Sequence, residues 1–209
     1  MVQKTQAKRG RPRAYDPDTA LARAMTAFWD AGYAATSLDD LSAATGMNRP
    51  SLYGAFGDKR ALYLKTLAGY RAAARAALKT ALAEERPLPE ALRRVYAAAL
   101  GLYLAGDNGA RGCFLIGTAA TQAVLDPAVR AVFADGLHEI DAAFAARIRF
   151  AQERGELRRD ADPAALARIA SAILHTLALR ARAGEKRAAL EATAEAGIAL
   201  ICGGEKPAA

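Results

Sequence analysis

Cysteine and histidine are scarce in this chain, which has two of each among its 209 residues. Two cysteines, Cys113 and Cys202, are too few for a disulfide framework and favour the reducing cytoplasm. The sequence has no closely spaced set of His and Cys ligands, so we expect no metal and no cofactor. The longest run without a charge, Cys113 to Leu125, is too short to cross a bilayer, and we expect no membrane partner.

The sequence also lacks the short motifs of common enzymes. It has no glycine-rich phosphate loop with its lysine and no motif around a nucleophilic serine. Asp39 and Asp40 are adjacent carboxylates, but neighbouring residues on a helix point apart, and both lie where they would stabilise a helix start. We therefore expect a protein that is not an enzyme.

What the chain does have is helix-forming residues and clear helix start signals. Hydrophobic residues make up 53% of it and charged residues 24%, alanine is abundant, and no stretch alternates as a strand would. Asp-Pro pairs at 16–17, 126–127 and 162–163 each match a capping residue followed by proline in the first turn. These signals predict an all-α protein of about nine helices, three short and then six longer. One of the six is expected to be an apolar helix from Cys113 to about Val124.

Positive charge is concentrated at the start of the chain. The net charge is +7, and five basic residues with no acidic one precede Tyr15, which suits a polyanionic partner. The segment from residue 9 to residue 13 reads RGRPR and has the Gly-Arg-Pro centre of an AT-hook, in which arginines enter a narrow A·T minor groove. A solvated tail that adds only non-specific affinity is the alternative.

Residues 32–65 predict two short amphipathic helices joined by a tight turn at Thr45, Gly46 and Met47. This is the helix-turn-helix arrangement, in which the second helix can enter the major groove of DNA. By periodicity alone, an ordinary helical hairpin is equally compatible with the stretch. A more specific pattern consists of Gly32, Tyr33, Thr36, Ser37, Leu38, Asp40, Leu41, Ala44, Gly46, Met47, Leu52, Tyr53, Phe56, Lys59 and Leu62.

In this order and spacing, those residues resemble the DNA-binding domain of TetR-type transcriptional repressors over about residues 14–65. The resemblance implies a three-helix DNA-binding domain followed by an all-helical ligand-binding and dimerisation domain. It further implies a homodimer that binds a palindromic operator in double-stranded DNA and releases it when a small molecule binds. The implied DNA contacts are Thr36, Ser37, Arg49, Pro50, Ser51, Tyr53, Gly54 and Lys59. Beside such a domain, we expect Arg9, Arg11 and Arg13 to enter the flanking minor groove.

The larger helical part gives weaker signals for a small-molecule site. Its mixture of apolar and polar residues between about 60 and 180 suits a mostly apolar pocket with a few polar groups. Most of the aromatic residues would serve a plain core equally well. The candidate pocket residues are Tyr96, Tyr103, Cys113, Phe114, Thr118, Gln122, Leu137, His138 and His175.

The last two helices have broad apolar faces with small residues among them. Such faces suit a four-helix interface in a two-fold dimer, and a purely intramolecular bundle is the alternative. The candidate interface residues are Leu166, Ala170, Ile173, Leu177, Leu190, Ala194, Gly197, Ile198 and Ile201.

Cys113 suggests a second mechanism. It is expected at a helix N-terminus two residues after Arg111, where the helix dipole and the positive charge would lower the pKa of the thiol. A redox or electrophile sensor would use such a thiol, whereas a small buried hydrophobe is the simpler explanation.

Together these features predict a basic arm at 1–14, a helix-turn-helix domain at 15–58, a helical ligand-binding and dimerisation domain at 59–204, and a tail at 205–209. The predicted function is that of a cytoplasmic, ligand-responsive repressor that binds DNA as a homodimer. The alternatives are a helical adaptor without sequence-specific DNA binding and a thiol-based sensor acting through Cys113.

Overall fold

The structure is a computed structural model that describes residues 16–83, 86–106 and 109–203. These residues form nine α-helices and one π-helix, and within them there is no strand, so the predicted all-α class is confirmed. The elements are α1 (Pro17–Ala31), α2 (Leu38–Thr45), α3 (Arg49–Phe56), α4 (Lys59–Ala81), α5 (Leu88–Tyr103), η1 (Leu115–Ala119), α6 (Ala120–Gln122), α7 (Pro127–Glu153), α8 (Pro163–Arg182) and α9 (Arg187–Cys202).

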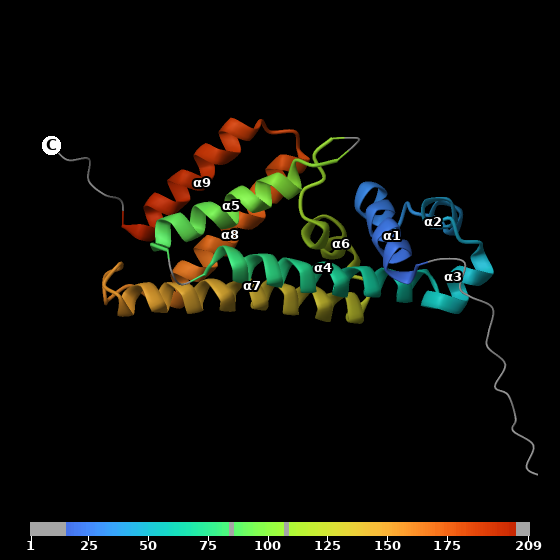
Figure 1. Cartoon of the computed structure of the whole chain (residues 1–209), viewed down its shortest axis with the longest axis horizontal. Coiled ribbons are helices and arrows are strands. Elements are labelled where there is room, and N and C mark those ends of the chain that lie inside the picture. Colours follow the sequence, from blue (N-terminus) through green and yellow to red (C-terminus); the bar gives the residue numbers. More distant parts are fainter. Residues whose placement is uncertain (1–15, 84–85, 107–108, 204–209) are drawn as a thin grey trace, which may run out of the picture.

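The molecule is elongated, with the three short helices α1, α2 and α3 gathered at one end (Figure 1). The long helices α4 and α7 run side by side along the molecule, and α5, α8 and α9 pack together over the other end. The η1 and α6 segment lies in the middle, where it contacts α1 as well as α4, α7 and α8. This middle segment therefore joins the small helical group to the larger one.

Each of the first four helices begins after a side-chain cap. Their N-cap side chains each accept a hydrogen bond from a backbone N–H two or three residues on, and these caps are Asp16, Ser37, Asn48 and Asp58. A helix of eight residues is unstable alone in water, so α2 and α3 depend on such caps and on packing. Gly46 ends α2 at a φ of 71°, a left-handed conformation that glycine adopts without strain.

The predicted apolar helix from Cys113 to Val124 is only partly correct. The chain is helical there, but five residues, Leu115–Ala119, form a π-helix, and the α-helix that follows is three residues long. The hydroxyl of Thr118 donates to the carbonyl oxygen of Phe114 at 2.8 Å and lies 2.8 Å from the hydroxyl of Tyr63 on α4. These side-chain bonds compete with a regular α-helical ladder, and π-helical turns are frequent at functional sites.

One apolar core runs through both groups of helices. In the larger group it includes fully buried side chains such as Leu92, Phe144 and Leu177, and in the smaller group Phe28 and Leu41. Helix α8 is long and apolar enough to cross a membrane by length and composition. In this fold α8 is a core helix, because α5, α7 and α9 all pack against it.

Candidate nucleic-acid interface and effector cavity

Helices α2 and α3 form a compact helix-turn-helix. Leu41 of α2 and Leu52 and Phe56 of α3 point into the core with α1, and the turn is fixed by the hydroxyl of Thr45, which accepts from the backbone N–H of Met47 at 3.3 Å. With its apolar side packed, α3 presents its opposite side to solvent. The helix-turn-helix predicted from the sequence is therefore present.

The exposed side of α3 carries Arg49, Pro50, Tyr53 and Gly54. Arg49 is 55% exposed and forms a two-pronged ion pair with Asp39 of α2, in which Nη2 lies 2.7 Å from Oδ2 and Nε lies 3.0 Å from Oδ1. The carboxylate holds the guanidinium at the surface, where its planar fork suits a phosphate or a guanine edge. The structure thus brings these predicted DNA contacts onto one surface.

The predicted phosphate contacts beside α3 divide into two groups. Ser37 is exposed and caps α2, and Lys59 lies over the ring of Tyr33, 4.5 Å from its centroid, where burial lowers the pKa of the ammonium. Thr36 is 1% exposed, and its hydroxyl donates to the carbonyl oxygen of Gly32 at 2.7 Å. The Thr36 side chain is therefore used inside the domain and is not part of the exposed surface around α3.

The remaining predicted DNA contacts are Ser51 and the three arginines of the basic arm. Ser51 is half-buried on α3, and its backbone N–H donates to the Asn48 cap. The basic arm with Arg9, Arg11 and Arg13 lies outside the described residues. The predicted DNA contacts that are at least partly exposed around α3 are thus Ser37, Arg49, Pro50, Ser51, Tyr53, Gly54 and Lys59.

Aromatic side chains join the helix-turn-helix to the larger group of helices. Trp29 of α1 contacts the edge of Tyr70 on α4 and the ring of Phe114, with centroid distances of 5.3 Å and 5.5 Å. Its indole N–H donates to the carbonyl oxygen of Arg111 at 3.3 Å. A displacement of Tyr70 or Phe114 would therefore act directly on α1.

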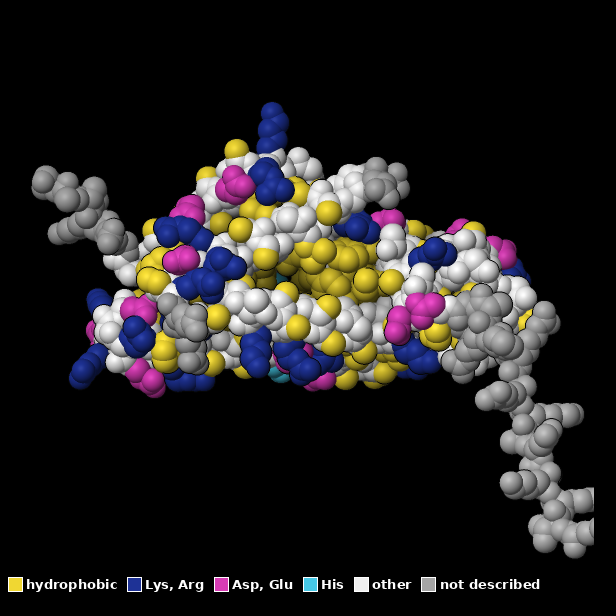
Figure 2. Space-filling view, viewed as in Figure 1, with side chains coloured by type: hydrophobic (Ala, Val, Ile, Leu, Met, Phe, Trp, Pro, Cys, Tyr) yellow, Lys and Arg dark blue, Asp and Glu magenta, His cyan; other side chains and the backbone are white. Residues whose placement is uncertain are grey.

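An apolar cavity of about 120 Å³ lies between α4 and α5, and Ile140 and Leu174 close it from α7 and α8. Figure 2 shows a hollow between these helices with hydrophobic side chains at its floor. The α4 and α5 residues that line it are Tyr70, Ala74, Ala77, Leu78, Ala81, Val95, Ala98, Ala99, Leu102 and Tyr103. Pockets for drug-sized ligands occupy roughly 300–1,000 Å³, so such a ligand would require α4 and α5 to separate.

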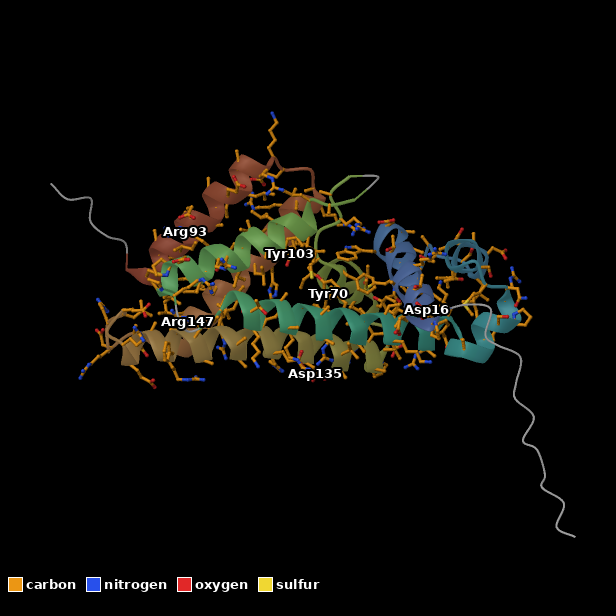
Figure 3. The ribbon with its side chains drawn as sticks, in the orientation of Figure 1. Asp16, Tyr70, Arg93, Tyr103, Asp135 and Arg147 are labelled. Atoms are coloured by element: carbon orange, nitrogen blue, oxygen red, sulfur yellow. The ribbon has the colours of Figure 1, made fainter. Side chains whose placement is uncertain are left out.

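Of the pocket residues predicted from the sequence, Tyr103 alone lines this cavity, where it lies near Tyr70 (Figure 3). Tyr96 is buried and donates to the carbonyl oxygen of Ala170, while Phe114 and Thr118 are buried at η1. Gln122, Leu137 and His175 are half-buried and His138 is exposed. Sequence reasoning missed the alanines of α4 and α5, although small residues on two facing helices are the signal that leaves a cavity.

The predicted low pKa of Cys113 is wrong. The thiol is 8% exposed, and burial raises its pKa, an effect that hydrogen bonds from backbone N–H groups and from the hydroxyl of Tyr70, 3.3 Å away, only partly oppose. The sequence argument considered the helix end and Arg111, but not the tyrosines that cover the sulfur. Burial also raises the pKa of Cys202, to about 11.

The residues predicted for a dimer interface face inward. Leu166 and Ile173 are half-buried, and the other seven are buried among α5, α8 and α9 of the same chain. Most of these side chains are thus covered by their own chain, and their place in a dimer interface stays a prediction. The opposite sides of the two helices are exposed and carry charged residues such as Arg168, Arg180, Glu191 and Glu195. The apolar residues exposed among them are Ile169, Ala172, Leu179, Ala192, Ala196, Ala199 and Leu200.

Two family models match the chain. The model described as bacterial regulatory proteins, tetR family, matches residues 20–66, and the tetracyclin repressor-like C-terminal domain matches residues 89–196. YezE of Bacillus subtilis, an HTH-type transcriptional regulator, is 32% identical over 76% of this chain and 82% of its own. ComR of Escherichia coli, an HTH-type transcriptional repressor, is 41% identical, but this chain spans only 54% of its length.

Solved structures show the same fold. A cysteine variant of the TetR family regulator CifR, bound to 26-base-pair operator DNA, is 32% identical with a TM-score of 0.82, covering 90% of this chain and 98% of that one. The reduced form of NemR from Escherichia coli has a TM-score of 0.76 at 18% identity, covering 92% and 98%. The fold and its exposed α3 define a helix-turn-helix DNA-binding protein. The chain belongs to the TetR family of transcriptional regulators, which are not enzymes.

Proposed function

We propose that this regulator is a repressor that binds a palindromic operator through α3 and releases it when a small molecule binds. The observation that carries the proposal is the exposed side of α3, where Asp39 holds Arg49 at the surface. The operator complex of CifR, a neighbour of the same fold, supports DNA as the partner. A helical adaptor without DNA binding would leave this exposed side without a role.

Substitutions at the Arg49–Asp39 pair test the proposal. Operator sequences are first selected from a random duplex library with the full-length protein, and affinity is then measured by fluorescence anisotropy. Arg49→Ala is expected to weaken binding by about 1–3 kcal/mol, because a charged fork contact is lost. Asp39→Asn is expected to weaken binding by less than Arg49→Ala does, since it loosens the ion pair that holds Arg49 at the surface but leaves the guanidinium in place. Arg93→Gln, on α5, is the control, and equal affinity of Arg49→Ala and the wild type would refute the role of α3.

The basic arm is proposed to enter the minor groove beside each half-site. A protein lacking residues 1–13 is expected to bind the operator more weakly and to lose any A·T preference in the flanks. Each lost phosphate contact flattens the slope of log affinity against log salt by about 0.9. An unchanged affinity, slope and flank preference would reduce the arm to a solvated tail.

The chain is proposed to divide into a DNA-binding domain at 15–58 and a ligand-binding and dimerisation domain at 59–204. The dimer is proposed to form through the exposed sides of α8 and α9. Leu179 and Leu200 are 56% and 70% exposed, which is unusual for large apolar side chains. Leu200→Glu is expected to give a monomer at micromolar concentration in sedimentation experiments. Val124→Glu is the control, since Val124 is 73% exposed but lies outside α8 and α9. A dimer in both variants would refute this interface.

The effector is proposed to be an uncharged, mostly apolar small molecule that enters the cavity beside Tyr70 and Tyr103. Its entry would move Tyr70 against Trp29 and so shift α1 and the helix-turn-helix behind it. Ala99→Phe is expected to fill the cavity, keeping operator binding while abolishing release by any effector found in a screen. Release by the same effector from Ala99→Phe would place the effector elsewhere. We propose the cytoplasm as the location of the protein.

A further inference from the structure

A second hollow lies at the end of the molecule away from the helix-turn-helix. It is an open groove of about 700 Å³ formed by the C-terminal part of α4, the start of α5 and the middle of α7. Of the ten described residues that line it, five are basic: Arg75, Lys79, Arg86, Arg94 and Arg147. The other five are Thr80, Leu82, Ala83, Ala143 and Ala146, so within the described part of the chain no carboxylate lines the groove.

Arg147 of α7 is the buried member of this set. It is 3% exposed, and Figure 3 shows it at the opposite end of the molecule from α1. Its Nη2 donates to the carbonyl oxygen of Arg86 and lies 3.5 Å from a carboxylate oxygen of Glu156. Its Nε and Nη1 have no hydrogen-bond partner among the described residues. A buried guanidinium with unused donors is costly unless a ligand or water pairs with it.

The other basic residues of the groove are mostly unpaired. Arg86 lies 3.6 Å from Glu90, but Arg75, Lys79 and Arg94 form no ion pair with any residue that the structure describes. Arg75 and Lys79 are four residues apart on α4, so their like charges repel across one turn of the helix. A bound anion would relieve this repulsion.

We propose that this groove is a binding site for a phosphorylated small molecule with at least two negative charges. Arginine forks pair two N–H groups with phosphate oxygens, and four of the five basic residues are arginines. The groove is separate from the apolar cavity, but the residues that line the two are neighbours in the sequence. Leu78 and Ala81 line the cavity, whereas Lys79 and Leu82 line the groove. The proposal does not depend on the operator or on the apolar effector.

Isothermal titration of the full-length protein with inorganic pyrophosphate at low salt tests the site. One pyrophosphate is expected to bind per chain, and Arg75→Gln and Arg94→Gln are each expected to weaken binding about tenfold. Arg147→Lys keeps the charge but loses the fork and is expected to have a similar effect. The matched control is Arg93→Gln, because Arg93 neighbours Arg94 on α5 but pairs with Glu195 at 3.0 Å and is expected to leave binding unchanged.

Several results would overturn the proposal. Equal losses in Arg93→Gln and Arg94→Gln would indicate general surface charge, and abolition by Arg49→Gln would place the anion on the DNA-binding surface. Citrate binding as tightly as pyrophosphate would refute the preference for phosphate. Glu84 and Glu85, which lie outside the described residues, stand between the lining residues Ala83 and Arg86 in the sequence. Binding seen only in a Glu84→Gln/Glu85→Gln variant would show that the chain's own carboxylates take the place of a ligand.

Discussion

The helix-turn-helix and the larger helical group are stabilised in different ways. In the first, helices of eight residues depend on local caps such as Ser37 and Asn48, each within three residues of the N–H it binds. In the second, α5 and α9 have no side-chain cap of their own, and the N–H of Leu88 at the start of α5 donates to Glu156, 68 residues away. The short helices need signals close at hand, whereas α5 and α9 form without a side-chain cap and rely on packing across the chain. The other long helices, α4, α7 and α8, have side-chain caps as well.

This difference has a consequence for function. The locally capped part holds α3 in a fixed position with its reading side exposed, as a DNA-binding surface requires. The packed part leaves a cavity and a groove between its helices. The two parts meet at Trp29, Tyr70 and Phe114.

Phe114→Ala is expected to have the largest effect on stability, because Phe114 is fully buried where the two parts meet. Loss of the ring is expected to lower the free energy of unfolding by about 3–5 kcal/mol. Urea unfolding followed by circular dichroism measures this, with Leu125→Ala, 78% exposed in the wild type, as the control. Two separate unfolding transitions in the wild type would show instead that the parts are independent and that the shared aromatic cluster does not couple them.

The rate at which Cys113 is labelled measures how well its thiol is buried at the same junction. Because burial raises the pKa of this thiol, iodoacetamide at pH 8 is expected to label it at least about a hundredfold more slowly in the native protein than in urea. Mass spectrometry of peptides distinguishes Cys113 from Cys202. Rapid labelling of the native protein would support the thiol-sensor alternative after all.

Cap removal compares the two parts directly. Ser37→Ala deletes the hydroxyl that accepts from the N–H of Asp40 at 3.1 Å, and it is expected to cost about 1 kcal/mol of stability. Lys186 is the corresponding residue of α9 but makes no side-chain cap, so Lys186→Ala is expected to change stability by less than about 0.5 kcal/mol. Chemical denaturation measures both, and equal effects would contradict the distinction between local and long-range stabilisation.

The smallest expected effect is a pH dependence at Asp126, which caps α7 and pairs with Arg60 at the start of α4. The hydrogen bond from Arg60 is the main cause that lowers the pKa of this carboxyl to about 2, from its usual 3.8. A lowered folded-state pKa stabilises the protein above pH 3.8, and this contribution is lost as the pH falls toward 2. Asp126→Asn is therefore expected to show a shallower loss of stability over that range in acid titrations. Identical acid profiles of the variant and the wild type would rule out this contribution.

Local signals made most of the fold predictable. The Asp-Pro starts at Asp16, Asp126 and Asp162 are all N-caps in the structure, because capping depends on residues close in sequence. The exposed side of α3 was predictable for the same reason, together with a family resemblance. The residues of the last two helices that were assigned to a dimer interface are mostly buried within the chain itself. Periodicity identifies the most apolar side of a helix but not whether the same chain or a partner covers it.

The sites of the larger group depend on residues far apart in sequence. Tyr70 lies 43 residues from the Cys113 sulfur to which its hydroxyl donates, and the groove combines residues from 75 to 147. No local pattern encodes such distances. The small residues of α4 and α5 were visible in the sequence, but which of them face each other depends on the packing angle of the helices.

Trp29 is the one tryptophan of the chain, and its place at the junction makes it an intrinsic optical probe. Its indole is 4% exposed, touches Tyr70 and Phe114, and has the guanidinium of Arg111 4.8 Å from its ring centroid. The colour and intensity of its emission depend on how well it is shielded from water and on that nearby charge. Tryptophan fluorescence can therefore follow the arrangement of the two parts in unlabelled protein. An effector that separates them is expected to shift the emission maximum of Trp29 to longer wavelength.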